Sequence, residues 1–365
     1  MDLTHFLKTM REKEASDMFL STNAPINIKV EGTLMPLSST GLPPGIIEKI
    51  AYSLMDDEQI AAFQREMECN LAVSIKQVGR FRVNVFRQRG EVGMVIRTIR
   101  SEIPKLDELN MPTHLYDLIM EKRGLILVVG GTGSGKSTTM ASMIDYRNSN
   151  KTGHILTVED PIEYIHRHKK SIINQREIGI DTHGYAPALK NALREAPDLI
   201  LIGEVNDAET MEAAVSFAET GHLCMATLHA NNSDQAMERV LNFFPSDMHN
   251  NILMNLALNL RAVISQRLVV DKEGKRRPAC EVLLNTPQIR ELIRKGQINE
   301  IKPAMEASLA EGMQSFDHAL YDMYKQDIIS LEEALLHADS KQGLEVRINL
   351  TSEEDKGSGY SDDFF

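Results

Sequence analysis

A glycine-rich segment, Gly130-Gly-Thr-Gly-Ser-Gly-Lys-Ser137, follows an unbroken apolar run at residues 125–129. Its residue types and spacing match the phosphate-binding pattern G-x-x-x-x-G-K-[ST], in which the backbone N–H groups of a turn point at phosphate oxygens. Lys136 would reach the outer phosphates of a nucleotide, and the Ser137 hydroxyl would bind Mg²⁺. Glycines are needed because a Cβ atom would block the close approach of the backbone. A dinucleotide-binding Rossmann pattern is excluded, because Lys136 stands where its last glycine should be.

The candidate nucleotide-binding residues are therefore the loop itself and the start of the helix that is expected to follow it. They are Gly131, Thr132, Gly133, Ser134, Gly135, Lys136, Ser137 and Thr138.

Acidic and polar residues follow three further apolar runs of strand type. Residues 154–158 precede Glu159, residues 199–202 precede Glu204 and residues 223–228 precede His229. In parallel sheets, ligands bind at the carboxyl ends of the strands. Hydrolysis of a phosphoanhydride needs a metal, a group that orients water and a group that senses the γ-phosphate. These positions supply all three, and the apolar run that leads to Glu204 is a Walker B pattern, with Glu204 a candidate for the Mg²⁺ site.

Each of these interpretations has a competitor when the residues are taken alone. Glu159, Asp160 and Glu163 also suit an acidic loop that caps a helix. His222 and His229 flank one strand in a spacing that fits no common zinc motif, so ordinary core or surface histidines remain the alternative.

The first hundred residues mix helical and alternating patterns, which predicts a small α+β domain. Helices are expected at residues 2–14, 43–55 and 57–67, and strands at 26–30, 80–86 and 93–99, with turns at Glu31-Gly32 and Arg89-Gly90. Within residues 80–86, apolar side chains take one face and polar ones the other, so Arg82 lies on the polar face. Arg97 lies in the neighbouring strand. The residues alone favour solvated arginines on an exposed sheet face.

Strand and helix patterns alternate after the glycine-rich loop, which predicts an α/β domain with a parallel sheet and flanking helices. The expected divisions are an N-terminal α+β domain at 1–101, a linker at 102–112 bounded by prolines, the ATPase domain with C-terminal helices at 113–350, and an acidic, disordered tail at 351–365.

Composition excludes several classes of protein. The formal charge of −12 and the lack of a long basic tract argue against nucleic acid as the main partner. The 3 cysteines are far apart, which fits a reducing compartment and excludes a four-cysteine zinc site. We expect no signal peptide and no direct membrane insertion, because polar residues interrupt the longest apolar stretch, at 252–270. The expected location is the cytoplasm.

The motifs together resemble those of the secretion-superfamily ATPases, and within them the type IV pilus retraction (twitching-motility) ATPases of the PilT/PilU type. The resemblance extends from about residue 3 to 350. It rests on GGTGSGKSTT at 130–139, ILTVEDPIEY at 155–164, INQREIG at 173–179, LREAPDLILIGE at 193–204, TGHLCMATLHANN at 220–232 and AVISQRL at 262–268. The stretch at 312–340 is more similar to the PilU branch than to the PilT branch.

The resemblance implies roles for the acidic and histidine residues. Glu163 resembles the general base that activates water, and Glu204 the Walker B acid that acts on Mg²⁺ and its waters. His222 and His229 match the His box, in which His229 lies near the γ-phosphate. Arg82 and Arg97 match N-terminal arginines that reach the nucleotide when the domains close.

The resemblance also implies a fold, ligands and partners. The fold would be a PAS-like N-terminal domain followed by a RecA-like P-loop ATPase domain, and the ligands ATP and Mg²⁺. The chain would form a homo-hexamer in the cytoplasm, peripheral to the inner membrane through the platform protein of the pilus machine. A sister retraction ATPase is a further candidate partner.

One departure from the family pattern concerns the segment after the Walker B strand. Relatives read GE-x-R-D there, whereas this chain reads Gly203-Glu-Val-Asn-Asp207. We expect Asn206 to cap the next helix, with Glu209 three residues on. The missing arginine puts an ion pair in doubt, so an accessory, weakly hydrolysing ring that assists a primary motor is the alternative to an autonomous retraction motor. A pilus-assembly or type II secretion ATPase is disfavoured, because neither a long extra N-terminal region nor a zinc insert is present.

Overall fold

The computed structural model describes residues 3–30, 32–307 and 312–357, and it divides into two compact units. The first unit comprises Met1–Glu102, Pro161–His166 and Arg176–Gly184; the second comprises Ile103–Asp160, Arg167–Gln175 and Tyr185–Phe365. Two short segments from beyond the glycine-rich loop thus belong to the first unit. The sequence did not predict this.

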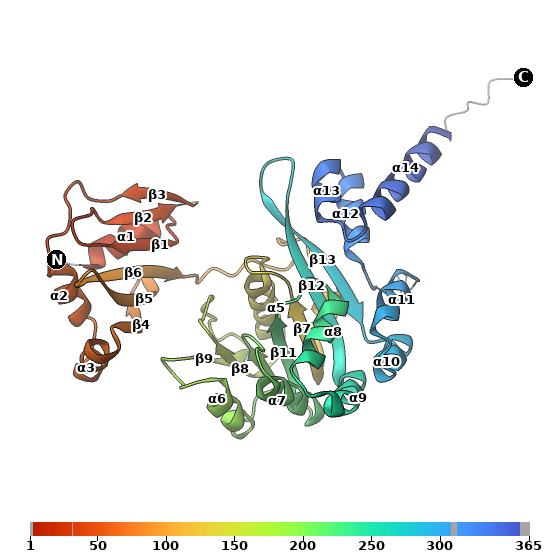
Figure 1. Cartoon of the computed structure of the whole chain (residues 1–365), viewed down its shortest axis with the longest axis horizontal. Coiled ribbons are helices and arrows are strands. Elements are labelled where there is room, and N and C mark those ends of the chain that lie inside the picture. Colours follow the sequence, from red (N-terminus) through yellow and green to blue (C-terminus); the bar gives the residue numbers. More distant parts are fainter. Residues whose placement is uncertain (1–2, 31, 308–311, 358–365) are drawn as a thin grey trace, which may run out of the picture. The chain divides into compact units, whose positions relative to one another are not determined.

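The first unit is built on an antiparallel sheet with the strand order β3-β2-β1-β6-β5-β4 (Figure 1). Its strands are β1 (Asp17–Leu20), β2 (Asn27–Val30), β3 (Thr33–Pro36), β4 (Glu68–Ile75), β5 (Gly79–Gln88) and β6 (Glu91–Ile99), and its helices are α1 (Leu3–Glu12), α2 (Ile46–Tyr52) and α3 (Asp57–Glu66).

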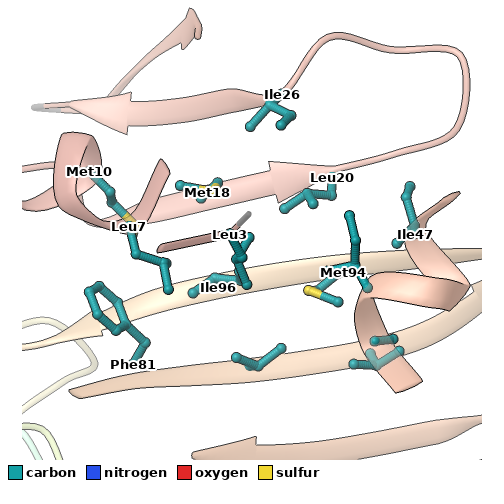
Figure 2. Packing of buried hydrophobic residues seen from close by; sticks show 14 of the residues in the cluster. Leu3, Leu7, Met10, Met18, Leu20, Ile26, Ile47, Phe81, Met94 and Ile96 are labelled. Carbon is teal, nitrogen blue, oxygen red and sulfur yellow. The ribbon is translucent and has the colours of Figure 1, made fainter. Parts of the chain in front are cut away.

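The core of this unit forms between α1, α2 and one face of the sheet. Leu3, Leu7 and Met10 recur at helical spacing on α1, and all three are buried. Figure 2 shows them beside sheet residues such as Met18 and Ile96, which are fully buried. Each large apolar side chain buried in this way stabilises the fold by about 1.5–3 kcal/mol. The apolar spacing of residues 2–14 is therefore explained by burial of one face of α1 in this core.

The expected elements of this unit are present, and two strands were not anticipated. The helices at 46–52 and 57–66 lie inside the predicted ranges, and the β5–β6 hairpin turns at Arg89-Gly90 as expected. β2 and β3 also form the predicted hairpin, although Glu31 of its turn lies outside the described residues. β1 and β4 were not predicted. β1 has only 4 residues and β4 mixes polar with apolar positions, so neither gives a clear alternation.

The second unit carries a sheet with the strand order β13-β12-β7-β11-β10-β8-β9, and most of its strands are labelled in Figure 1. The strands are β7 (Gly124–Val129), β8 (Gly153–Glu159), β9 (Ser171–Glu177), β10 (Leu199–Ile202), β11 (Leu223–Leu228), β12 (Leu260–Val270) and β13 (Arg276–Leu284). The pairs from β12 through β7, β11 and β10 to β8 are all parallel, and β13 is antiparallel to β12.

Helices flank this sheet, which confirms the predicted α/β architecture. They are α4 (His114–Met120), α5 (Lys136–Asn150), α6 (Tyr185–Ala192), α7 (Ala208–Glu219), α8 (Ser233–Asn242), α9 (His249–Asn259), α10 (Pro287–Arg294), α11 (Ile301–Ala307), α12 (Phe316–Lys325), α13 (Leu331–His337) and α14 (Lys341–Gly357). Every residue of β7, β10 and β11 is buried, because both faces of a parallel sheet are covered. Among the residues that the structure describes, no helix has the length and apolar character to cross a bilayer.

Strand register places four carboxyl ends at one edge of the sheet. Leu228 at the end of β11 pairs with Val129 at the end of β7. Ile202 at the end of β10 pairs with Val158 of β8 on one side and Ala226 of β11 on the other. The loops that follow β7, β8, β10 and β11 therefore leave the sheet side by side.

The expected linker and tail differ from what the structure shows. Within the segment 102–112, Leu106 and Met111 are buried in the core of the second unit. Because the segment is mostly polar, its sequence gave no indication that these two apolar side chains are part of a core. At the other end of the chain, α14 continues to Gly357 into the segment that was expected to be disordered, and residues 358–365 lie outside the described residues.

Asp207, and not Asn206, caps helix α7. The Asp207 side chain accepts a hydrogen bond of 2.8 Å from the backbone N–H of Thr210. The expectation that Asn206 is the cap is wrong because the helix begins at Ala208, one residue later than a cap at Asn206 requires. Asn and Asp are equally good caps, so the residue types did not decide between them.

The cap assignment predicts different effects for two adjacent alanine substitutions. Asp207→Ala should lower the free energy of unfolding of the second unit by about 1 kcal/mol, because it leaves first-turn N–H groups unpaired. Amide exchange at Thr210 should become faster. The matched control, Asn206→Ala, should change neither quantity appreciably. The assignment fails if Asn206→Ala has the larger effect on Thr210 exchange.

Candidate active site

The glycine-rich loop adopts a backbone conformation that only glycine tolerates well. Gly133 and Gly135 have φ angles of 76° and 90°. A Cβ atom on Gly135 would lie 2.7 Å from Nε2 of Gln266, and one on Gly130 would lie 2.5 Å from the carbonyl oxygen of Gln266. The two glycines are thus required by the chain beneath the loop as well as by a phosphate above it.

Lys136 is folded back over the loop. Its Nζ donates hydrogen bonds of 2.8 and 2.9 Å to the carbonyl oxygens of Gly130 and Gly131. Burial lowers the pKa of Lys136, and the negative charge of Glu204 opposes that shift. The ammonium group is held at the mouth of the loop, where phosphate oxygens can replace the two carbonyls as its acceptors.

The first turn of α5 is open for an anion. Its N-cap, Gly135, has no side chain to bond the first N–H groups, so these donors remain for a ligand. Ser134 Oγ is buried and makes no hydrogen bond within the described part of the chain. Ser137 is exposed at the start of the helix. Thr132 is exposed and Thr138 half-buried, so the predicted binding residues surround one helix terminus.

Gln266 anchors the loop from below, a role that sequence reasoning did not assign. The hydroxyl of Thr139 donates a buried hydrogen bond of 2.8 Å to Oε1 of Gln266. This bond ties the first turn of α5 to strand β12. Its signal in the sequence is a polar Ser-Gln-Arg run inside an apolar strand, where a buried polar side chain needs a specific partner.

The side chains of Glu204 and His229 are in contact at the carboxyl ends of β10 and β11. The distance between Nε2 of His229 and Oε1 of Glu204 is 2.8 Å, and both side chains are partly exposed. The pair brings together the Walker B acid and the His-box residue that the sequence predicted separately. A cleft of about 290 Å³ beside it is lined by His229, by Gly131 and by one face of α8.

The acidic box after β8, which comprises Glu159, Asp160 and Glu163, is divided between the two units. Oε1 of Glu159 accepts hydrogen bonds from the hydroxyl of Thr157 at 2.6 Å and from the side chain of Gln175 at 3.2 Å. Glu163 belongs to the first unit, where its backbone carbonyl accepts a hydrogen bond of 3.3 Å from the N–H of Arg100. The Glu163 side chain is exposed. The backbone of this glutamate is therefore held by the end of β6.

His222 lies at the amino end of β11, at the opposite edge of the sheet from the glycine-rich loop. Its carbonyl accepts a hydrogen bond of 3.1 Å from the N–H of Gly124, where β7 begins. Six residues of strand lie between His222 and His229, so the two positions are about 23 Å apart at about 3.3 Å per residue. The two histidines flank β11, as the sequence predicted, and do not form one cluster. The role of His222 in the His box stays a prediction.

Arg82 and Arg97 are directly opposite each other in β5 and β6. They therefore share one face of the sheet, which the sequence had predicted for Arg82 alone. Nε of Arg97 lies 2.8 Å from Oδ1 of Asp17 on β1. Arg82 lies near Glu177: burial raises the pKa of Glu177, and the charge of Arg82 opposes that shift. Both arginines thus have acidic neighbours within the first unit.

Arg267 on β12 joins the His-box loop to the C-terminal helices. Its guanidinium donates to the carbonyl oxygen of Asn231 at 3.3 Å, to that of His337 at 2.6 Å and to the carboxylate of Asp339 at 2.6 Å. The same group lies 3.9 Å from the ring centre of Phe316. The ion pair is largely buried, so its removal would leave unpaired charge in the interior.

A second acidic group lies under α8. Glu281 is 1% exposed and accepts hydrogen bonds from the N–H of Ser233 at 2.7 Å and from the hydroxyl of Ser265 at 2.9 Å. Burial raises the pKa of Glu281 despite these bonds. Burial, reinforced by the charge of Glu281, raises the pKa of Asp234 to about 6. Oδ1 of Asp234 has no hydrogen-bond partner among the described residues.

The residues present suit Mg²⁺ bound together with phosphate more than a metal held by protein alone. Within the described ranges, no group of three or more His, Cys, Asp or Glu side chains is arranged to hold an ion. Mg²⁺ commonly keeps several waters and binds through one or two protein oxygens plus substrate phosphates. The Ser137 hydroxyl and the Glu204 carboxylate provide such oxygens.

Comparisons with known proteins give one family. Residues 2–297 match the family described as type II/IV secretion system protein. The chain is 51% identical over 356 residues to the type IV pilus ATPase PilU of Pseudomonas aeruginosa, covering 97% of this chain and 93% of PilU. It is 40% identical over 334 residues to the retraction ATPase PilT of the same organism, covering 92% of this chain and 97% of PilT.

A solved structure agrees with the sequence relatives. The crystal structure of the pilus retraction motor PilT with bound ADP superposes with a TM-score of 0.88, at 40% identity, covering 94% of this chain and 99% of that chain.

The raised pKa of Asp234 predicts a pH-dependent effect of Asp234→Asn. Because the folded pKa of about 6 exceeds the ordinary aspartate pKa of 3.8, the carboxyl supports folding only at low pH, and this support is lost as pH rises through 6. The variant should be more stable than the wild type by about 1 kcal/mol near pH 8, a value discounted because the group is partly exposed. The advantage should shrink toward about pH 4.

Urea unfolding of the second unit across this pH range provides the measurement. An effect of the substitution that is independent of pH would mean that packing or helix capping, and not the ionisation of Asp234, determines the difference.

Proposed function

The chain belongs to the type II/IV secretion system protein family and is a P-loop ATPase of the PilT/PilU type, and from this we propose that it hydrolyses ATP to drive the retraction of type IV pili. The single observation that carries the proposal is the 2.8 Å pair between Glu204 and His229 at the strand ends beside the P-loop. The pair provides the carboxylate of Glu204 and, in contact with it, the imidazole of His229, which can move when the charge near that carboxylate changes.

The P-loop supports nucleotide binding by position and charge. The phosphates of ATP would lie over the open N–H groups of the first turn of α5. Lys136 would exchange the carbonyl oxygens of Gly130 and Gly131 for phosphate oxygens, which restores its hydrogen bonds without moving it far. Mg²⁺, bound by the Ser137 hydroxyl and through water by Glu204, would neutralise part of the phosphate charge.

We assign the hydrolytic step to Glu163, which would orient and deprotonate the attacking water. Arg82 and Arg97 would stabilise the charge that develops on the transferred phosphoryl group, a role for which arginine is well suited. Arg97 is paired with Asp17, so it must exchange this partner for the nucleotide, whereas Arg82 is near the charge of Glu177.

His229 is assigned to coupling. Loss of the γ-phosphate would change the charge near Glu204, and the bonded imidazole would follow. The resulting movement of the loop after β11 is the first step by which hydrolysis becomes mechanical work. The chemistry is a cycle of closure and release, with no covalent intermediate on the protein.

The proposal includes an assembly and a location. We infer a homo-hexamer in the cytoplasm that is peripheral to the inner membrane and bound there to the pilus platform protein. The relatives described as type IV pilus ATPases support this part of the proposal.

A second candidate function is an accessory ring that hydrolyses ATP slowly by itself and assists a sister retraction ATPase. The higher identity to PilU, 51% against 40% for PilT, favours it. So does Asn206, where related chains carry an arginine. The two candidates differ in the turnover of the isolated protein.

Two substitutions test the assigned site. Lys136→Ala should abolish binding of ATP, because it removes the positive charge held over the loop. Glu163→Gln should keep ATP binding but lower turnover by about 10² or more, because the amide cannot accept a proton. Steady-state ATPase assays with Mg²⁺, together with equilibrium binding and the oligomeric state of each sample, provide the measurement.

The outcomes separate the candidates. Clear turnover by a hexamer that both variants lose supports the autonomous motor. Rings that bind ATP yet turn over slowly until a sister ATPase is added support the accessory function. Unchanged turnover in Glu163→Gln would contradict the assigned general base.

A further inference from the structure

Tyr185 places a hydroxyl group among the acidic residues of the site, and neither the motifs nor the proposed mechanism uses it. The residue opens helix α6. Its hydroxyl oxygen is buried and makes no hydrogen bond of ordinary geometry with the described residues. A Cβ atom on Gly203 would lie 3.0 Å from this oxygen. The hydroxyl therefore occupies the space that the missing side chain of Gly203 leaves free, directly before the Walker B acid.

The surroundings of the hydroxyl are anionic. Burial, and then the charges of Asp160, Glu204 and Glu159, raise the pKa of Tyr185. The phenol is thus neutral at physiological pH and carries a proton that it can donate. A neutral hydroxyl that is surrounded by carboxylates can donate a hydrogen bond to any of them without adding charge to the site.

The backbone around Glu204 leaves one N–H group facing the Tyr185 oxygen. The neighbouring groups are already used: the N–H of Gly203 donates to the carbonyl of Val158 at 2.7 Å, and that of Val205 to the carbonyl of Thr227 at 2.9 Å. The N–H of Glu204 lies close enough to the phenol oxygen to lower its pKa, although it does not reach ordinary hydrogen-bond geometry. The acceptor side of the hydroxyl therefore has a partner within reach, and its donor side has none on the backbone.

A buried hydroxyl without partners is unfavourable, because its hydrogen bonds to water are lost and not replaced. Phenylalanine would fill the same space without this cost. The hydroxyl becomes favourable only in a state of the site in which an acceptor takes its hydrogen bond. Among the carboxylates that raise the pKa of Tyr185, Asp160 has the largest effect. The Asp160 side chain is exposed and can therefore rotate toward the hydroxyl.

We propose that Tyr185 is a positioning residue for ATP hydrolysis: in the nucleotide-loaded site its hydroxyl accepts from the N–H of Glu204 and donates to the carboxylate of Asp160. This bridge ties the acidic box after β8 to the end of β10, and so fixes the Walker B carboxylate relative to the residues that handle water. The inference rests on the proposed ATPase function.

Tyr185→Phe provides the first test, because it removes the hydroxyl and keeps the ring. Turnover should fall about tenfold, the effect of one hydrogen bond lost between ground and transition state. The KM for ATP and the affinity for MgADP should change less than about twofold, since the bridge orients the site and does not hold the nucleotide. Without nucleotide, the variant should unfold at the same temperature as the wild type or higher, because it lacks the unpaired hydroxyl.

Tyr116→Phe is the matched control. The ring of Tyr116 packs edge-on against Tyr146 with centroids 4.6 Å apart, and its hydroxyl lies beside the backbone of Asp107. This variant should lose some stability and keep its turnover. A purely structural role for Tyr185 would give the same pattern in Tyr185→Phe, and that result would overturn the proposal.

A double-mutant cycle with Asp160→Ala tests the partner, because alanine removes the acceptor that the amide oxygen of asparagine would keep. If the two groups act through one hydrogen bond, the double variant should be within about twofold of the slower single variant. Effects that multiply would show that the hydroxyl does not act through Asp160 and would contradict the bridge.

One further measurement is independent of turnover. With MgADP bound, the amide of Glu204 should exchange faster in Tyr185→Phe than in the wild type, because its acceptor is gone. Turnover that stays absent in the wild type even beside a sister ATPase would refute the proposed function, whereas equal exchange rates would refute the bridge alone.

Discussion

The parallel register of the central strands is the constraint on which the rest of the structure depends. Because Leu228 pairs with Val129, and Ile202 with Val158, the loops after β7, β8, β10 and β11 emerge at one edge of the sheet. Residues that are far apart in the sequence are brought together by backbone hydrogen bonds alone. A shift of one residue in any of these pairs would turn each inward side chain outward and separate the acid of β10 from the histidine of β11.

The same sheet also supports the phosphate loop. The glycines need unusual backbone angles, which cost free energy unless surrounding groups enforce them. Gln266 supplies this enforcement from β12: its backbone and side chain lie where Gly130 and Gly135 have no Cβ, and its amide oxygen bonds Thr139. Binding residues above the loop and a polar residue below it are therefore parts of one arrangement, although 127 residues separate Thr139 from Gln266 in the chain.

Sequence reasoning succeeded where a pattern is local and physically strict. The P-loop, the strands at 199–202 and 223–228, and the alternation that places Arg82 on the polar face of β5 are of this kind. It was less informative where tertiary contacts decide. The cap of α7 depends on where the helix begins, and the buried state of Leu106 depends on a distant core. Tyr185 gave no signal in the sequence, because the role proposed for its hydroxyl depends on residues that become its neighbours only in the folded chain.

The contacts of Arg267 have a consequence for how the site communicates with the rest of the second unit. One guanidinium donates through Nη2 to the carbonyl of Asn231 and to Asp339, and through Nη1 to the carbonyl of His337 at the end of α13. A planar, rigid group cannot keep all three contacts if their acceptors move apart. A rearrangement of the loop that carries Asn231 must therefore either displace the guanidinium or break its exposed bond of 3.3 Å to Asn231. Helices α12–α14 begin beyond residue 297, where the family match ends. One side chain thus joins a loop inside the region that matches the family to helices that lie beyond it.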